Sequence, residues 1–168
     1  TILEACKLAN VYIPSLCYHP DLPASGHCEL CLVKIDGLGY AYSCMTHVRE
    51  KMQIQTDSPD VIERVKKAFN NFYDLKSQPE STDLEDVYQF LNQKNPSHVR
   101  TAEKTSFISF NPNKCIKCSK CVRLCSDVLD IGALDDDNLS IASSNCISCG
   151  LCTNVCPTKA LIETSSIS

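Results

Sequence analysis

The residues between positions 58 and 92 show the clearest helical spacing of apolar side chains. After Ser58 and Pro59, apolar side chains recur every three or four positions, at Val61, Val65, Phe69 and Phe72. This spacing predicts an amphipathic helix with Ser58 as its N-cap and Pro59 in its first turn. Thr82 and Glu85 form a capping box for a second helix, to about Asn92. The apolar positions of that helix are Leu84, Val87, Tyr88 and Leu91.

Shorter elements are predicted near the two ends of the sequence. Thr1 as N-cap and Glu4 at the third helical position predict a short helix to about Asn10. The expected strands lie at 106–110, at 139–142, near Ala133 and near Leu161. The pattern therefore indicates an α+β chain.

Composition adds one feature that dominates the rest, 13 cysteines in 168 residues. Disulfides, zinc and iron–sulfur clusters compete to explain them. An odd count, with many cysteines three positions apart, argues against a disulfide framework. Such thiols persist in a reducing compartment. Because only 43% of the residues are hydrophobic, bound metal is expected to form part of the core.

Twelve of the cysteines fall into two zones, from Cys17 to Cys44 and from Cys115 to Cys156. No cysteine lies between Met45 and Lys114. This distribution predicts a first domain at 1–58, a helical linker at 59–104 and a second domain at 105–168.

The second zone is an internal repeat. Its first run is Cys115, Cys118, Cys121 and Cys125, and the run recurs 31 residues later as Cys146, Cys149, Cys152 and Cys156. This is the bacterial dicluster ferredoxin spacing, in which the fourth cysteine of each run ligates the other cluster. We therefore expect two 4Fe–4S clusters. Cluster A would use Cys115, Cys118, Cys121 and Cys156, and cluster B would use Cys125, Cys146, Cys149 and Cys152. Pro157 follows the last ligand, whereas Ser126 stands at the equivalent position of the first run.

The first zone contains Cys17, Cys28, Cys31 and Cys44. Four thiolates suffice for one 2Fe–2S cluster, but they also suffice for one zinc ion. The spacing differs from the plant-type ferredoxin pattern. By spacing alone, both interpretations stay open.

The residues around both zones resemble a known family. The stretches Ile13-Pro-Ser-Leu-Cys17-Tyr-His-Pro-Asp-Leu-Pro23, Gly26-His-Cys28-Glu-Leu-Cys31-Leu-Val-Lys-Ile35 and Ser43-Cys44 are similar to the N-terminal 2Fe–2S domain of iron-only (FeFe) hydrogenases. Asn113-Lys-Cys115-Ile-Lys-Cys118 and Cys121-Val-Arg-Leu-Cys125 are similar to the dicluster domain of the same enzymes. The resemblance implies a 2Fe–2S ferredoxin domain of the β-grasp type, with Cys17, Cys28, Cys31 and Cys44 as ligands.

Two departures from this family stand out. The family has a β-hairpin before the helix that begins here at Thr1, so this sequence resembles a fragment. The family also inserts a His-x3-Cys-x2-Cys-x5-Cys domain for a further 4Fe–4S cluster. Residues 61–104 keep the length of that insert but none of its cysteines. We therefore expect a helical remnant that holds no metal.

The resemblance implies that the chain relays single electrons between a soluble carrier and the catalytic centre of an FeFe hydrogenase. The carrier would be a ferredoxin or an NADH-oxidising subunit, and the compartment the cytoplasm or the matrix of an anaerobic organelle. Residues 1–168 would have no catalytic site of their own, since every cysteine zone is committed to a cluster. Two alternatives stay open. One is an electron-transfer part of another oxidoreductase, such as a formate dehydrogenase, a complex I-like or an electron-bifurcating complex. The other is a structural scaffold stabilised by metal.

The remaining candidate residues are given structural or electrostatic roles. Cys6 is expected to be a free thiol that packs as a small apolar side chain. The four histidines, His19, His27, His47 and His98, lack a cysteine partner set. The first dicluster run is basic, through Lys114, Lys117, Lys120 and Arg123, which fits either docking of an acidic carrier or compensation of thiolate charge. Acidic residues 135–137 are expected to form a solvated turn. A net charge of −4 and the lack of an apolar run of roughly 20 residues give no reason to expect nucleic acid or a membrane span.

Overall fold

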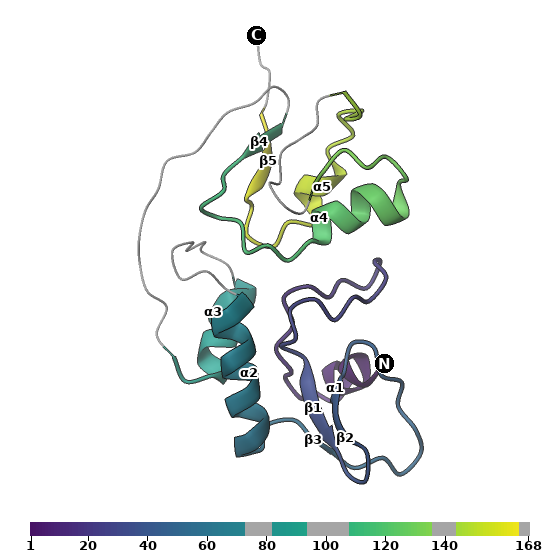
Figure 1. The fold of residues 1–168 in the computed structure, drawn as a ribbon, viewed down its shortest axis with the longest axis vertical. Helices are drawn as coiled ribbons and strands as arrows, with labels where there is room; N and C mark the ends of the chain where they lie inside the picture. Colours follow the sequence, from purple (N-terminus) through teal and green to yellow (C-terminus); the bar gives the residue numbers. More distant parts are fainter. Residues whose placement is uncertain (73–81, 94–107, 136–143, 165–168) are drawn as a thin grey trace. The chain divides into compact units, whose positions relative to one another are not determined.

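The computed structural model describes residues 1–72, 82–93, 108–135 and 144–164. They belong to two compact units (Figure 1). The first unit comprises residues 1–18, 23–73 and 82–94, and the second comprises residues 19–22, 74–81 and 95–168. No helix among the described residues is both long and apolar enough to cross a bilayer.

The first unit is built on a small antiparallel sheet with α1 (Ile2–Leu8) beside it (Figure 1). Strands β1 (Leu32–Ile35), β2 (Gly39–Tyr42) and β3 (Ile54–Gln55) lie in the order β2-β1-β3. The register of the first pair places Leu32 opposite Tyr42 and Ile35 opposite Gly39. The predicted capping box of α1 is confirmed, since the Glu4 N–H donates to Thr1 Oγ1 at 3.4 Å. The helix ends at Leu8, two residues before the predicted end at Asn10.

The core of this unit lies between α1 and the sheet. It contains Ile2 and Leu3 from the helix, Ile13, Val33 and Ile35, together with Cys31 and Cys44. Burial of the aliphatic side chains stabilises the unit by roughly 1.5–3 kcal/mol each. The core is therefore continuous with one of the cysteine zones.

Two helices, α2 (Pro59–Phe72) and α3 (Thr82–Phe90), complete the first unit (Figure 1). The start of α2 at Pro59 is as predicted, whereas α3 includes Thr82 instead of using it as the residue before the helix. The apolar stripes of both helices are buried, at Val61, Val65, Phe69, Leu84, Val87, Tyr88 and Leu91. The rings of Phe69 and Tyr88 meet edge to face with centroids 5.2 Å apart. Apolar packing thus holds the helical segment together.

The first turn of α2 is tied to the sheet by polar contacts. Lys34 Nζ lies 2.7 Å from Asp60 Oδ2, and the Tyr40 hydroxyl donates to the same oxygen at 2.6 Å. These bonds hold the pKa of Asp60 well below its usual range, with Lys34 as the largest cause. The helix is therefore attached to both β1 and β2.

The described residues of the second unit form a two-stranded sheet and three short helical segments (Figure 1). Strand β4 (Ile108–Phe110) pairs antiparallel with β5 (Leu161–Glu163), with Ser109 opposite Ile162. Helix α4 (Lys120–Arg123) continues into a π-helical segment, η1 (Leu124–Val128), and α5 (Leu151–Asn154) follows later.

The predicted strands at Phe110 and Leu161 are confirmed as β4 and β5. The prediction of a strand near Ala133 is wrong, because this stretch forms only an isolated bridge at Leu134. The predicted strand at 139–142, and residues 106–107 of the strand before the first run, lie outside the described residues.

Candidate iron–sulfur sites

The cysteines of the second unit surround two separate cavities. One cavity is lined by set B, which we define as Cys125, Cys146, Cys149 and Cys152. The other is lined by set A, defined as Cys115, Cys118, Cys121 and Cys156. Each set combines three cysteines of one run with the fourth cysteine of the other run. The structure therefore groups these thiols in the crossed way expected from the spacing.

The chemistry of each cavity lining suits a cluster. Four thiols line each cavity, and the remaining described lining of the set B cavity is aliphatic. Within the described ranges, no three His, Cys, Asp or Glu side chains converge on a single-ion site. Four thiolates are the ligand set of a 4Fe–4S cluster, so the donor set of each cavity fits that group.

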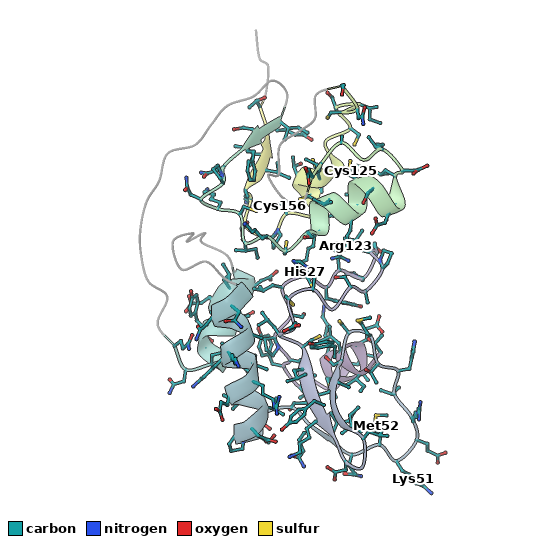
Figure 2. The ribbon with its side chains drawn as sticks, viewed as in Figure 1. His27, Lys51, Met52, Arg123, Cys125 and Cys156 are labelled. Atoms are coloured by element: carbon teal, nitrogen blue, oxygen red, sulfur yellow. The ribbon has the colours of Figure 1, made fainter. Side chains whose placement is uncertain are left out.

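The crossing follows from one short helical segment. Cys121 lies on α4 and Cys125 on η1, so consecutive turns of the same segment carry one cysteine of set A and one of set B. Figure 2 shows Cys125 on this segment and Cys156 in the stretch that follows α5. Six of the eight cysteines, all except Cys118 and Cys149, belong to or pack against one buried core that also contains Ile108, Ala133 and Leu161. Bound clusters would therefore form part of the core of this unit.

Electrostatic interactions among the thiols follow the same grouping. Burial raises the pKa of Cys121, and its neighbours Cys118, Cys115 and Cys156 raise it further. Burial likewise raises the pKa of Cys152 to about 11, with contributions from Cys149, Cys146 and Cys125. The neighbours named for each thiol include the other three members of its set. Metal binding would displace these protons, since only thiolates are ligands.

Cys125 and Cys156, the fourth cysteines of the two runs, accept comparable backbone hydrogen bonds. The Ala133 N–H donates to Cys125 Sγ at 3.3 Å, and the Ala160 N–H donates to Cys156 Sγ at 3.2 Å. The alanine is eight residues beyond the cysteine in the first run and four residues beyond it in the second. Segment η1 accounts for the four additional residues in the first run, because the helix continues through Ser126. In the second run, the helix ends at Asn154, shortly before Pro157, which cannot continue a helix. The serine thus changes the helix but keeps the amide donor.

The first unit holds four buried cysteines, Cys17, Cys28, Cys31 and Cys44, each no more than 1% exposed. The β1–β2 hairpin brings Cys31 and Cys44 together, since the Ser43 N–H donates to the Cys31 carbonyl at 2.8 Å. Cys28 approaches from the preceding loop, and its N–H donates to Cys17 Sγ at 3.4 Å. All four predicted residues are therefore brought to one end of the sheet.

These four thiols form two pairs. A hydrogen bond with Cys17 is the largest cause that raises the pKa of Cys28, and burial adds to it. A hydrogen bond with Cys44 likewise raises the pKa of Cys31, and the same bond lowers the pKa of Cys44. A 2Fe–2S rhombus takes two protein ligands on each of its two irons. The four buried thiols would suit that cluster as its ligands.

The other candidate residues lie away from these sets. Cys6 packs against the core of the first unit, and burial raises its pKa, as expected of a structural thiol. His19 accepts a hydrogen bond from the Asp21 N–H at 3.2 Å, and His47 is exposed. His98 and residues 136–137 lie outside the described part of the chain. The burial of Lys120, which is 6% exposed, could not be predicted from the local sequence.

Two family models match the chain in the order expected. Residues 1–59 match a 2Fe–2S iron–sulfur cluster binding domain, and residues 109–164 match a 4Fe–4S dicluster domain. The predicted fold class is therefore confirmed, with ferredoxin-like domains of mixed helix and sheet, a 2Fe–2S domain first and a dicluster domain second. The first match also favours a 2Fe–2S cluster over zinc at Cys17, Cys28, Cys31 and Cys44.

Individual proteins align with nearly the whole chain. A protein of Staphylococcus haemolyticus named as a formate dehydrogenase is 28% identical over 188 residues, which cover 97% of this chain and 19% of that protein. One of Staphylococcus aureus strain USA300 with the same kind of name is 29% identical over 187 residues, or 96% of this chain and 19% of its own length. The chain therefore spans about a fifth of the length of these relatives.

A solved structure shares the fold. It is the crystal structure of an NAD⁺-reducing [NiFe]-hydrogenase in the H₂-reduced state, with a TM-score of 0.71 and 20% identity. The match covers 99% of this chain and 81% of the solved one. The findings do not single out FeFe hydrogenases. They show an iron–sulfur electron-transfer module.

Proposed function

We propose that this iron–sulfur electron-transfer module carries three clusters and passes single electrons between a soluble carrier and the catalytic centre of an oxidoreductase. One 2Fe–2S cluster would be held by Cys17, Cys28, Cys31 and Cys44. Two 4Fe–4S clusters would be held by set A and set B. The observation that carries the proposal is the pair of cavities, each lined by three cysteines of one run and the fourth of the other.

The clusters, when bound, supply one-electron chemistry without proton or group transfer. The chain supplies the rest. Buried thiols bind iron as thiolates, and their burial excludes water from the ligands. The amides of Ala133 and Ala160 donate to the crossing sulfurs, which stabilises the more negative reduced state.

The catalytic centre that fits best is that of a formate dehydrogenase. Support comes from the two staphylococcal proteins of that name, which align with at least 96% of the chain. Their alignment extends through the helical segment between the cysteine zones as well as over the zones themselves. An FeFe hydrogenase is the second candidate, and it is favoured by the motif residues around Cys17 and Cys28. The carrier would be a ferredoxin or an NADH-oxidising subunit.

The test is anaerobic EPR of the full-length protein after addition of formate or of hydrogen. Reduction of the clusters by formate but not by hydrogen would support the first candidate, and the opposite result would support the second. Dithionite serves as the positive control, because it should reduce the clusters whatever the catalytic partner is. A loaded protein in which dithionite produces no paramagnetic cluster would refute electron transfer and would favour the structural scaffold.

A further inference from the structure

The two cavities of the second unit differ in the charge of the side chains around them. Lys117 and Lys120 line the cavity of set A. The described lining of the set B cavity consists of its cysteines and aliphatic side chains. Lys120 is only 6% exposed, so its ammonium group has little access to water. Set A thus has two nearby cations that set B lacks.

An acidic side chain lies beside set B instead. Gly150 stands between Cys149 and Cys152, and a Cβ at this position would overlap Oε1 of Glu163. The carboxylate of β5 therefore rests against the backbone of the loop that carries set B. The repeat makes the comparison direct, since Ser119 stands at the position equivalent to Gly150 in the first run.

We propose that Lys117, Lys120 and Glu163 make the two 4Fe–4S clusters unequal, so that cluster A accepts the first electron and cluster B is harder to reduce. This inference rests on the proposed cluster assembly. Each reduction adds one electron from a low-potential donor to one cluster, and no bond forms or breaks. The added charge is stabilised by a nearby cation and destabilised by a nearby anion.

Lys117 lies beside a ligand of set A. Its backbone N–H donates to Cys115 Sγ at 3.4 Å, a contact that Lys117→Gln would keep, and the residue lines the cavity. Burial raises the pKa of Cys115, and the charge of Lys117 acts to lower it.

Solvent acts in the opposite direction, because Cys149 of set B is exposed and hydration also stabilises a reduced cluster. That exposure affects one of four ligands. The fixed charges are two cations at one cavity and one anion at the other. Lys117 and Glu163 are exposed, so solvent screens their charges, whereas Lys120 is buried and its charge is screened least. We therefore expect the fixed charges to set the order.

The experiment is an EPR-monitored redox titration of the anaerobically loaded full-length protein and four variants. Lys117→Gln removes a cation from cluster A, and Glu163→Gln removes the anion from cluster B. Ser148→Lys places a cation at the position that matches Lys117, and the backbone accepts it, since φ is +52° at Lys117 and +56° at Ser148. Lys7→Gln, at an exposed position of α1, makes the same charge change in the other unit.

The wild type should show two midpoint potentials for its 4Fe–4S clusters. Lys117→Gln should lower the higher one, while Ser148→Lys and Glu163→Gln should raise the lower one. Each change is expected to alter the distribution of the electron between the clusters about tenfold, equivalent to about 59 mV for one electron. Lys7→Gln should leave both unchanged. Iron content and spin count should match the wild type in every variant.

Two results would overturn the inference. One is a single midpoint potential shared by both clusters in the wild type. The other is a shift of the same potential by Lys117→Gln and Ser148→Lys, which would mean that the charges do not act on separate clusters. Absence of the 4Fe–4S clusters from the wild type would instead refute the proposed function, so the two failures are distinguishable.

Discussion

Replacement of Phe69 by alanine tests whether apolar packing, without metal, holds the helical segment. The ring of Phe69 is fully buried between α2 and α3 and meets Tyr88 edge to face. Truncation of a buried Phe to Ala costs about 3–5 kcal/mol, and an aromatic pair contributes about 0.5–1.5 kcal/mol beyond its buried area. Since a domain is stable by only about 5–15 kcal/mol, Phe69→Ala should remove a large share of the stability of the first unit.

The expected change in melting temperature is correspondingly large. For a domain of 60–100 residues, 1 kcal/mol corresponds to roughly 4–8 °C, so the first unit should melt at least about 12 °C lower. The assay is anaerobic thermal unfolding, followed through the visible absorption of the 2Fe–2S cluster. Lys67→Ala, an exposed position on the same helix, is the control and should stay within about 0.5 kcal/mol of the wild type.

A small effect would refute this reasoning. If Phe69→Ala melted within a few degrees of the wild type, the packing of α2 on α3 would not be what stabilises the segment. The reasoning would also be refuted if a chelator that leaves all three clusters intact lowered the stability of the first unit. That result would indicate a further metal in the segment.

Three further predictions concern single side chains. Cys125→Ser should impair cluster B and Cys156→Ser cluster A, as judged by which 4Fe–4S EPR signal is lost; loss of the cluster of the variant's own run would contradict the crossed assignment. Cys6→Ser should leave the iron content and all EPR signals at wild-type levels, and a missing cluster would make this thiol a ligand. Asp60→Asn should lower the melting temperature of the first unit equally at pH 7 and pH 5. The pKa of Asp60 is depressed in the folded state, so its stabilising contact with Lys34 is present above an unfolded pKa of about 3.9 and is lost only at lower pH. A deficit that shrinks between pH 7 and pH 5 would exclude this carboxylate as the cause.

Local signals in the sequence predicted much of the fold because they depend on few residues. A capping box needs only Thr1 and Glu4, and the start of α2 needs only Ser58 and Pro59. The grouping of cysteines around the two cavities could likewise be inferred from the repeat, since the spacing of each run limits which thiols can reach a common centre.

Features that depend on contacts across the fold could not be predicted in the same way. Segment η1 arises because Ser126 permits the helix to continue, but nothing local specifies a π-helical turn rather than a loop. The absence of a strand at Ala133 follows from the use of its N–H by Cys125 Sγ. The carboxylate of Glu163 reaches Gly150 only because α5 packs beside β5. This last contact places a carboxylate beside set B.

The most direct test of the three-cluster account is the metal content of anaerobically purified protein that comprises residues 1–168. Iron, zinc and acid-labile sulfide are measured per chain. One 2Fe–2S and two 4Fe–4S clusters predict about ten iron atoms and about ten sulfides, with no stoichiometric zinc. About eight iron atoms together with one zinc would show that Cys17, Cys28, Cys31 and Cys44 hold zinc. Zinc in place of iron at all three sites would contradict the account as a whole.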